Sequence, residues 1–295
     1  MIRDSITGEY TLVGATRGAR PNEYRDGPSL GCPFCPGNEA QTPPELARIG
    51  EREWRVRAFA NKYPAVVPPE GAHEVIVDAP THDVEITREG MEMWRERYGA
   101  LRERFPHGWP VLFKNRGAYA GATILHPHTQ AIAVARRPVR WEAMTQAARA
   151  GAGCPWCAEI HAARERGLVV AEHDAAIAYV RENSRFGWAL TLAPLECSLS
   201  LDRASEAAWT GAGALLAAAV EVLLGNLGAA SPFNVLVPSD PHAAPGTFHW
   251  HLELVPRLAT LAGFELASGM FIRSALPQES AERWRRMFTL PHGPL

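Results

Sequence analysis

The chain of 295 residues carries 30 Lys and Arg against 32 Asp and Glu, and 46% of its residues are hydrophobic. Such a length buries one large core or two ordinary ones. The near balance of charge excludes a strong basic field, so we expect no nucleic-acid or membrane partner and a small-molecule substrate. The first residues lack the apolar stretch of a signal peptide, and no segment approaches the roughly eighteen uninterrupted apolar residues of a membrane span. A cytoplasmic protein with reduced cysteines is therefore expected.

The first half of the chain predicts strands around one helix. Residues 54–68 and 72–87 are predicted as strands because they carry alternating or β-branched residues on either side of a turn at 61–64. Residues 88–105 repeat large apolar side chains every three or four positions, which predicts a helix. Residues 111–115 and 129–134 are predicted as two further strands, joined by a glycine-containing loop.

The second half repeats this order. It predicts strands over 169–180 and 188–192, a helix over 204–226, and strands over 234–237 and 249–255. Three groups of possible metal ligands also recur in the same order. These are a Cys-x-x-Cys run, a Cys or His after a strand, and a His-x-His run. We infer an internal duplication of an α+β unit. The boundary is expected near 140–150, with residues 151–153 as a connection.

Two groups of Cys and His predict two metal sites. Cysteines two positions apart present both thiolates to one tetrahedral ion, and the repeat nominates the other ligands in each half. Sulfur and imidazole ligation in a closed site indicates zinc in a structural role. An unmetallated turn and a redox dithiol are the alternatives for each pair. The expected ligands are Cys32, Cys35, His82 and His126 in the first half, and Cys154, Cys157, Cys197 and His249 in the second.

The run from His126 to Gln130 predicts a covalent nucleophile. On an extended strand His126 and His128 lie on the same side, so one can ligate the metal while the other faces a substrate. A neutral imidazole attacks phosphorus well and leaves readily once phosphorylated, which makes His128 the candidate. Gln130 adds a neutral amide for a phosphoryl oxygen. The preceding loop, residues 113–123, offers small residues and two cations, typical of a phosphate cradle or equally of a flexible surface loop.

Other histidines are expected to have structural roles. His251 is the repeated counterpart of His128, but Leu252 and Glu253 follow it in place of Thr and Gln. We therefore expect His251 to be structural or to line a pocket. His73 and His242 are expected to be ordinary strand or loop histidines rather than ligands.

At these residues the sequence resembles the galactose-1-phosphate uridylyltransferase family, the two-domain branch of the histidine-triad superfamily that also contains a plant ADP-glucose phosphorylase. The resemblance implies an α+β fold of two tandem histidine-triad-like domains, 1–145 and 146–295, each a mainly antiparallel sheet packed with helices. The matching segments cover nearly the whole chain: residues 32–39 with 42–45, 60–65, 73–77, 113–130 and 263–266.

The resemblance also implies a reaction in galactose metabolism. His128 would take UMP from UDP-glucose or a related nucleotide sugar, and then pass it to galactose 1-phosphate, a hexose 1-phosphate, in a ping-pong sequence. Gln130 would contact the transferred phosphoryl group, and a homodimer is expected. The further substrate-binding residues that it implies are Asn61 and Asn115 around the nucleotide, Thr123 near the transferred phosphoryl group, and Glu265 near the sugar.

Departures from the family pattern leave alternatives open. Better-known bacterial uridylyltransferases hold the second metal with a glutamate and histidines, whereas Cys154, Cys157 and His249 are similar to the plant phosphorylase. Cys197 stands where that arrangement has a histidine. A nucleotide-sugar phosphorylase or adenylyltransferase of the ADP-glucose type would use the same histidine intermediate with inorganic phosphate as acceptor. A zinc-stabilised nucleotide-binding protein without catalysis is the third possibility.

Overall fold

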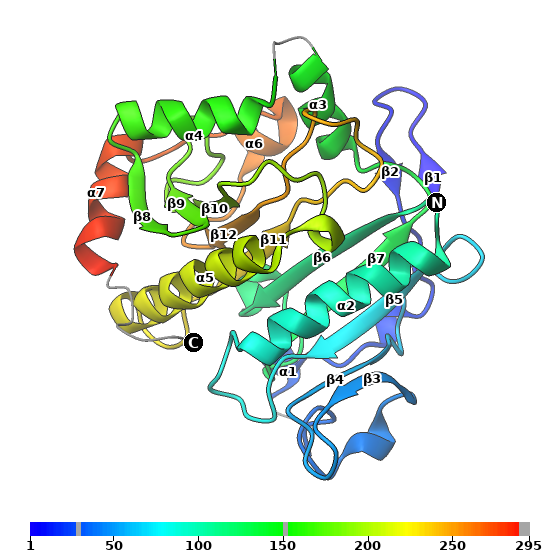
Figure 1. Ribbon diagram of the computed structural model, residues 1–295. Coiled ribbons are helices and arrows are strands. Elements are labelled where there is room, and N and C mark those ends of the chain that lie inside the picture. Colours follow the sequence, from blue (N-terminus) through cyan, green and yellow to red (C-terminus); the bar gives the residue numbers. More distant parts are fainter. Residues whose placement is uncertain (28–30, 150–152, 289–295) are drawn as a thin grey trace. The chain divides into compact units, whose positions relative to one another are not determined.

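The computed structural model describes residues 1–27, 31–149 and 153–288, and the chain divides into two compact units (Figure 1). Unit 1 comprises Met1–Lys114 and Thr123–Gln146. Unit 2 comprises Asn115–Ala122 and Ala147–Leu295. A short segment from the first half thus belongs to unit 2. Gly151 and Ala152, expected in the connection, lie outside the described residues.

Unit 1 is built on an antiparallel sheet, one face of which is covered by helix α2 (Arg88–Arg104). The helix begins where the hydroxyl of Thr87 accepts a hydrogen bond from the Gly90 amide, at 2.8 Å. The apolar stripe predicted for 88–105 is its buried side, where Trp94 and Leu101 are at most 1% exposed. Among the described residues the strands, in spatial order, are β3 (Glu45–Ile49), β4 (Val56–Ala60), β5 (Gly71–Val77), β7 (His128–Val134) and β6 (Trp109–Arg116).

Shorter elements complete unit 1. Strands β1 (Ile2–Arg3) and β2 (Tyr10–Thr11) pair with each other, and the single turn of α1 (Glu23–Asp26) follows them. Helix α3 (Val139–Arg149) begins in unit 1 and ends in unit 2. The sequence patterns did not predict these elements or β3.

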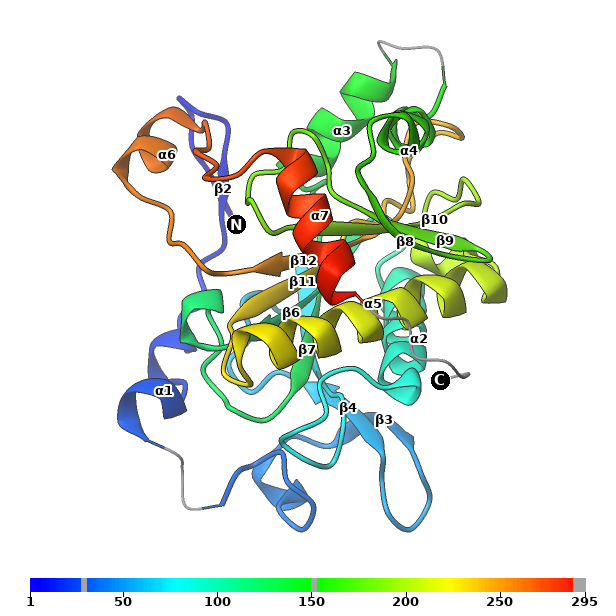
Figure 2. The ribbon, with the colours of Figure 1, turned by 90° about the vertical axis from the view of Figure 1, so that its left-hand side faces the viewer.

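Unit 2 has the same plan. Figure 2 shows helix α5 (Glu206–Leu227) running along the strands, with α7 (Pro277–Met287) beside it. Helices α4 (Pro155–Glu165) and α6 (Gly263–Ser268) also belong to unit 2. Its described strands form an antiparallel series in the order β8 (Val169–His173), β9 (Ala176–Tyr179), β10 (Leu190–Pro194), β12 (Leu252–Pro256) and β11 (Phe233–Val237).

The five strands are therefore arranged in the same spatial order in both units. In each unit the fifth of these strands along the chain lies between the third and the fourth. Several local expectations were wrong: the strands expected over 54–68 and 72–87 end at Ala60 and Val77. Residues 169–180 form two strands because the chain turns at 174–175. The strand expected over 249–255 begins only at Leu252. Cys157 lies in the first turn of α4, because Pro155 starts a helix there.

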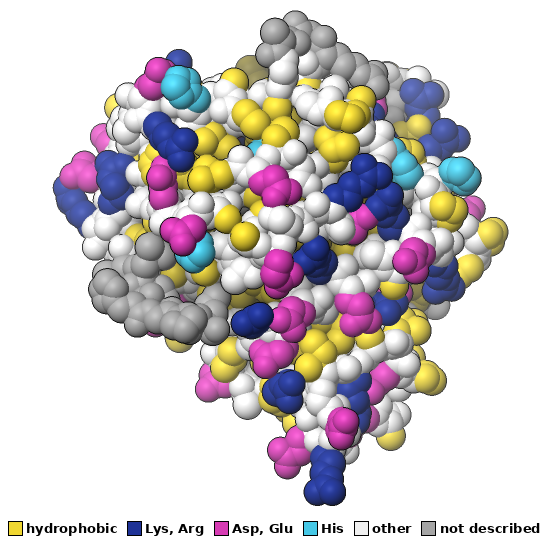
Figure 3. All heavy atoms as spheres, viewed as in Figure 1, with side chains coloured by type: hydrophobic (Ala, Val, Ile, Leu, Met, Phe, Trp, Pro, Cys, Tyr) yellow, Lys and Arg dark blue, Asp and Glu magenta, His cyan; other side chains and the backbone are white. Residues whose placement is uncertain are grey.

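The distribution of charged side chains on the surface agrees with the near balance of basic and acidic residues in the sequence (Figure 3). On the face drawn in Figure 3, basic and acidic side chains are interspersed. Helix α5 is long and apolar enough to cross a membrane by length and composition. However, 67% of its apolar window is buried, as in the core helix of a soluble protein.

A buried ion pair joins α2 to β5 and predicts a large stability effect. The guanidinium of Arg97 contacts both carboxylate oxygens of Glu74 at 2.8 and 3.0 Å, and the side chain of Glu74 is 2% exposed. Arg97→Met leaves this carboxylate buried without a partner and should lower the free energy of unfolding by about 3 to 5 kcal/mol, measured by urea denaturation. The double variant with Glu74→Met should recover part of that loss. Equal losses in the single and double variants would contradict this account.

Candidate active site and metal clusters

His128 is the first residue of β7 and lies opposite Val77 of β5. Its Nδ1 lies 2.8 Å from the backbone carbonyl oxygen of His126. Because a carbonyl oxygen only accepts, Nδ1 carries the proton and Nε2 keeps its lone pair. Burial lowers the pKa of His128, and the bond to the His126 carbonyl opposes this only in part. The imidazole is therefore neutral at pH 7, which is the state a nucleophile needs.

Gln130 and Asn61 both contact His73, a histidine for which the sequence patterns predicted no role in the site. Gln130 lies two residues after His128 and hence on the same face of the sheet. His73 Nε2 lies 3.0 Å from Gln130 Oε1 and 3.1 Å from Asn61 Nδ2. The amide of Ala65 donates to His73 Nδ1 at 3.0 Å. The signal missed was the strand register, which places His73 opposite Ile132 and so beside Gln130.

The other face of β7 is anchored to a buried carboxylate. Asp78 accepts hydrogen bonds from Thr129 Oγ1, Lys114 Nζ and Trp94 Nε1 at 2.8, 2.8 and 2.7 Å. Lys114 also lies 3.3 Å from Glu85, and its side chain is 1% exposed. This cluster connects the end of β5 with β6, β7 and α2, next to His128 along β7. It thereby limits the freedom of the strand that carries His128.

The first group of predicted ligands converges in unit 1. Cys35 Sγ lies 3.2 Å from His82 Nε2, and both Cys32 Sγ and Cys35 Sγ lie within 3.7 Å of His126 Nδ1. The four ligand atoms are all within 4.8 Å of one another. His126 Nε2 lies 2.8 Å from the Ala79 carbonyl oxygen, so it donates its proton there and leaves Nδ1 for a metal.

The second group repeats this arrangement in unit 2. Cys154 Sγ and Cys157 Sγ lie 3.8 and 3.7 Å from His249 Nδ1, and Cys197 completes a set within 4.8 Å. His249 Nε2 donates to the Pro194 carbonyl oxygen at 3.0 Å. Each cluster has the donor set and the compactness to hold a metal ion.

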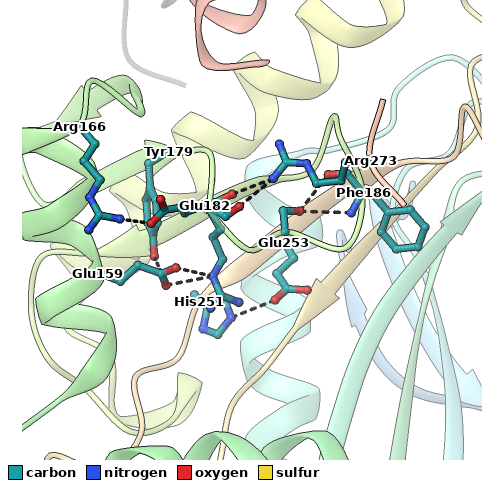
Figure 4. Close-up of polar contacts among 10 residues, drawn as sticks. Glu159, Arg166, Tyr179, Glu182, Phe186, His251, Glu253 and Arg273 are labelled. Carbon is teal, nitrogen blue, oxygen red and sulfur yellow. Dashed lines mark hydrogen bonds and ion pairs between the residues drawn. The ribbon is translucent and has the colours of Figure 1, made fainter. Parts of the chain in front are cut away.

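His251, the counterpart of His128, is engaged differently (Figure 4). Its Nδ1 lies 2.9 Å from the His249 carbonyl oxygen, which repeats the arrangement of His128. Its Nε2, however, lies 3.3 Å from the carboxylate of Glu253, which stands where the first half has Gln130. Next to this pair, Arg181 binds Glu159 at 2.9 Å. A carboxylate at the attacking nitrogen repels an anionic phosphoryl group, so this histidine is not arranged as a nucleophile.

The loop expected to cradle phosphate is held within unit 2. Asn234 Nδ2 donates to Asn115 Oδ1 at 2.8 Å and to the Ala120 carbonyl oxygen at 2.9 Å. Gly117 has φ 82°, and a Cβ there would lie 2.8 Å from Pro232 Cβ, so only glycine fits. The segment 115–122 is therefore packed and hydrogen-bonded rather than a free surface loop.

Thr123 and Glu265 make hydrogen bonds outside these clusters. Thr123 is in unit 1, where its carbonyl oxygen accepts from the Glu23 amide at 2.8 Å. Glu265 is in unit 2, where its carboxylate accepts from the Ala262 amide at 3.1 Å and caps α6. Their roles toward a substrate stay predictions, as does that of Asn115.

A cavity of about 290 Å³ opens on unit 1 over the far ends of β6 and β7. It is mainly apolar, with two basic residues among those that line it. The nucleophile strand contributes Ile132 and Val134 but neither His128 nor Gln130. The cavity therefore does not include His128 or Gln130, but it lies beside them on the same face of the sheet, because its Phe113 is opposite Gln130 and its Ile132 is opposite His73.

No family model matches the chain. Individual known proteins, however, align with nearly its whole length. An ADP-glucose phosphorylase from Arabidopsis thaliana is 23% identical over 329 residues, covering 97% of this chain and 92% of that protein. A galactose-1-phosphate uridylyltransferase from Thermotoga maritima is 24% identical over 322 residues, covering 95% and 96%.

Solved structures agree in fold. An Arabidopsis thaliana ADP-glucose phosphorylase with bound ADP-glucose aligns with a TM-score of 0.77 at 22% identity, covering 91% of this chain and 92% of that one. A uridylyltransferase structure aligns with a TM-score of 0.82 at 24% identity, covering 97% of each. The predicted α+β fold, mainly antiparallel and packed with helices, is confirmed. The chain is related to the galactose-1-phosphate uridylyltransferase family, including its ADP-glucose phosphorylase-type members, which confirms the resemblance.

His73 predicts a pH-dependent loss of stability. The side chain is 3% exposed, and burial lowers its pKa to about 4 from an ordinary 6.5. The unfolded chain therefore takes up a proton between pH 6.5 and 4 that the folded chain does not. The free energy of unfolding should fall through this window by up to about 3 kcal/mol and gain nothing from His73 above pH 6.5.

Urea unfolding of the wild type and of His73→Gln between pH 7 and 4.5 measures this contribution, since the difference removes acid effects common to both. The variant should lose less stability on acidification. His107→Gln, at an exposed histidine, is the control and should follow the wild type. Parallel curves for the wild type and His73→Gln would contradict the account.

Proposed function

We propose that the chain is a nucleotidyltransferase in which His128 takes a nucleoside monophosphate from a nucleotide sugar. The observation that carries the proposal is the hydrogen bond from His128 Nδ1 to the His126 carbonyl oxygen at 2.8 Å. It fixes the tautomer that leaves Nε2 free to attack. The names of the relatives above, a phosphorylase and uridylyltransferases of nucleotide sugars, support this class of reaction, and the contrast with His251 favours His128 as its nucleophile.

The first step is an in-line displacement at the α-phosphorus. The lone pair of His128 Nε2 forms a bond to phosphorus while the bond to the bridging oxygen breaks, and the sugar 1-phosphate leaves. The imidazole gains positive charge, which the carbonyl oxygen accepting from Nδ1 stabilises. Gln130 donates to a phosphoryl oxygen. In the second step a phosphate oxygen of the acceptor forms a bond to phosphorus while the bond from phosphorus to His128 Nε2 breaks, and His128 returns to its neutral state with the electron pair on Nε2.

We propose UDP-glucose as donor and galactose 1-phosphate as acceptor, as in the uridylyltransferase relatives. A second assignment, ADP-glucose with inorganic phosphate, has its own support. The second cluster draws on Cys154, Cys157 and His249, the pattern that resembles the plant phosphorylase, and the Arabidopsis thaliana relative covers 97% of the chain. Both assignments share the His128 step and differ only in base and acceptor. A homodimer and a cytoplasmic location complete the proposal.

We also propose that both clusters bind zinc as a structural ion. Thiolate and imidazole donors suit zinc, and four donors in each set leave no open position for a water molecule. The ion in unit 1 would hold His126, whose carbonyl orients the nucleophile. Neither ion takes part in the bond changes.

Intact-protein mass spectrometry tests the covalent step. After brief incubation with UDP-glucose, the wild type should carry an acid-labile adduct of one UMP, and His128→Asn should carry none because it lacks the attacking nitrogen. His251→Asn, the matched variant of the second unit, should still form the adduct. The same protein with ADP-glucose reports the base preference, since an AMP adduct supports the phosphorylase assignment.

Two results would contradict the proposal. One is an adduct that persists in His128→Asn, and the other is the lack of any adduct with both nucleotide sugars. The second result would favour a nucleotide-binding protein without catalysis. Once the adduct is formed, its loss on adding galactose 1-phosphate or inorganic phosphate identifies the acceptor.

Metal content tests the two clusters separately. The purified wild type should hold two zinc ions per chain, and Cys35→Ser and Cys157→Ser should each lose one, measured by elemental analysis. Cys35→Ser should also slow adduct formation at least about tenfold, because displacement of His126 misplaces the nucleophile. Cys157→Ser should slow it much less. Equal slowing in both variants would show that metal loss acts only through general instability.

A further inference from the structure

The hydrogen bonds around His73 define its tautomer. The amide of Ala65 donates to His73 Nδ1 at 3.0 Å, so Nδ1 is an acceptor and carries no proton. The neutral ring must then carry its proton on Nε2. That N–H points at Gln130 Oε1, 3.0 Å away and contributed by the neighbouring strand.

This tautomer orients two side-chain amides. Gln130 Oε1 accepts from His73, and Asn61 Oδ1 accepts from the Tyr63 amide at 2.8 Å. The 3.1 Å contact between Asn61 Nδ2 and His73 Nε2 joins two donors, so it is not a hydrogen bond in this state. Both NH2 groups thus have no acceptor among the described residues. They stay available to an anionic ligand.

We propose that His73 is a positioning residue that holds the Gln130 amide with its NH2 group toward the transferred phosphoryl group. Without the Nε2–H of His73, the Gln130 side chain is free to rotate by half a turn and to present its carbonyl oxygen instead. A carbonyl oxygen repels a phosphoryl oxygen, whereas the NH2 group stabilises it. The inference rests on the proposed nucleotidyl transfer and adds the residue that fixes its phosphoryl donor.

The placement of His73 excludes a role in packing alone. Along β5, His73 and Val75 alternate with Glu74, whose carboxylate binds Arg97 of α2. His73 therefore lies on the sheet face away from α2, the same face as His128 and Gln130. An apolar side chain would fill this position as well, but it would leave the Ala65 amide and Gln130 Oε1 without partners.

The tautomer is measured without any turnover. Nitrogen-15 NMR of histidine-labelled protein should show His73 neutral and protonated on Nε2 from pH 5.5 to 8, assigned by comparison with His73→Gln. A ring protonated on Nδ1 would overturn the proposal, whether or not the protein transfers nucleotides. This measurement separates failure of the positioning role from failure of the proposed function.

The kinetic test is a double-mutant cycle on the rate of adduct formation with the nucleotide sugar that labels the wild type. His73→Met should slow the step roughly tenfold with little change in donor affinity, the size expected for losing one hydrogen bond in the transition state. Gln130→Met should slow it at least as much. In the Gln130→Met background, His73→Met should have less than a twofold effect, because its target is gone.

Two further variants separate positioning from loss of structure. His73→Gln, which keeps a donor, should recover most of the rate. Ile132→Ala removes apolar contact directly opposite His73 and should leave the rate within about twofold. Slowing by Ile132→Ala as large as by His73→Met, or additive effects in the cycle, would overturn the proposal.

Discussion

The candidate active site depends on one backbone group, the carbonyl oxygen of His126. It accepts the Nδ1 proton of His128, 2.8 Å away, and so decides which ring nitrogen can attack phosphorus. The side chain of His126 belongs to the Cys and His cluster, and its Nε2 donates a hydrogen bond to the Ala79 carbonyl oxygen. One residue thus links the Cys and His cluster to the proposed nucleophile, so an ion bound in the cluster would hold the carbonyl that orients His128 without taking part in the proposed bond changes.

The two units place a similar pair of histidines in different surroundings. In both, a histidine of the metal cluster orients a second histidine through its carbonyl, at 2.8 and 2.9 Å. The difference lies two residues further on, where Gln130 faces His73 while Glu253 faces His251. A neutral amide can donate to a phosphoryl oxygen, whereas a carboxylate occupies the ring nitrogen and repels the phosphate. The residue two positions after each histidine is therefore what distinguishes the proposed nucleophile from a histidine whose Nε2 lies against a carboxylate.

Local sequence patterns predicted the parts of the fold that are themselves local. The stripe of α2 and the long apolar α5 follow from periodicity, and the repeat brought together both sets of four ligands. The contacts of His73 and Asp78 were not predictable, since they depend on register between strands far apart in the chain. The sequence around Lys114, a single charged residue within a strand, likewise does not predict its buried ion pair with Asp78. The packed state of segment 115–122 depends on Asn234, more than a hundred residues away.

The two-step path through His128 is tested most directly by isotope exchange in the absence of acceptor. Labelled glucose 1-phosphate is added to the wild type with the unlabelled nucleotide sugar that forms the adduct. If the enzyme carries the nucleotidyl group on His128, the label should enter the nucleotide sugar, because the first step runs in reverse without a second substrate. Exchange that requires the acceptor, or turnover without exchange, would contradict a covalent intermediate and point to direct transfer between bound substrates.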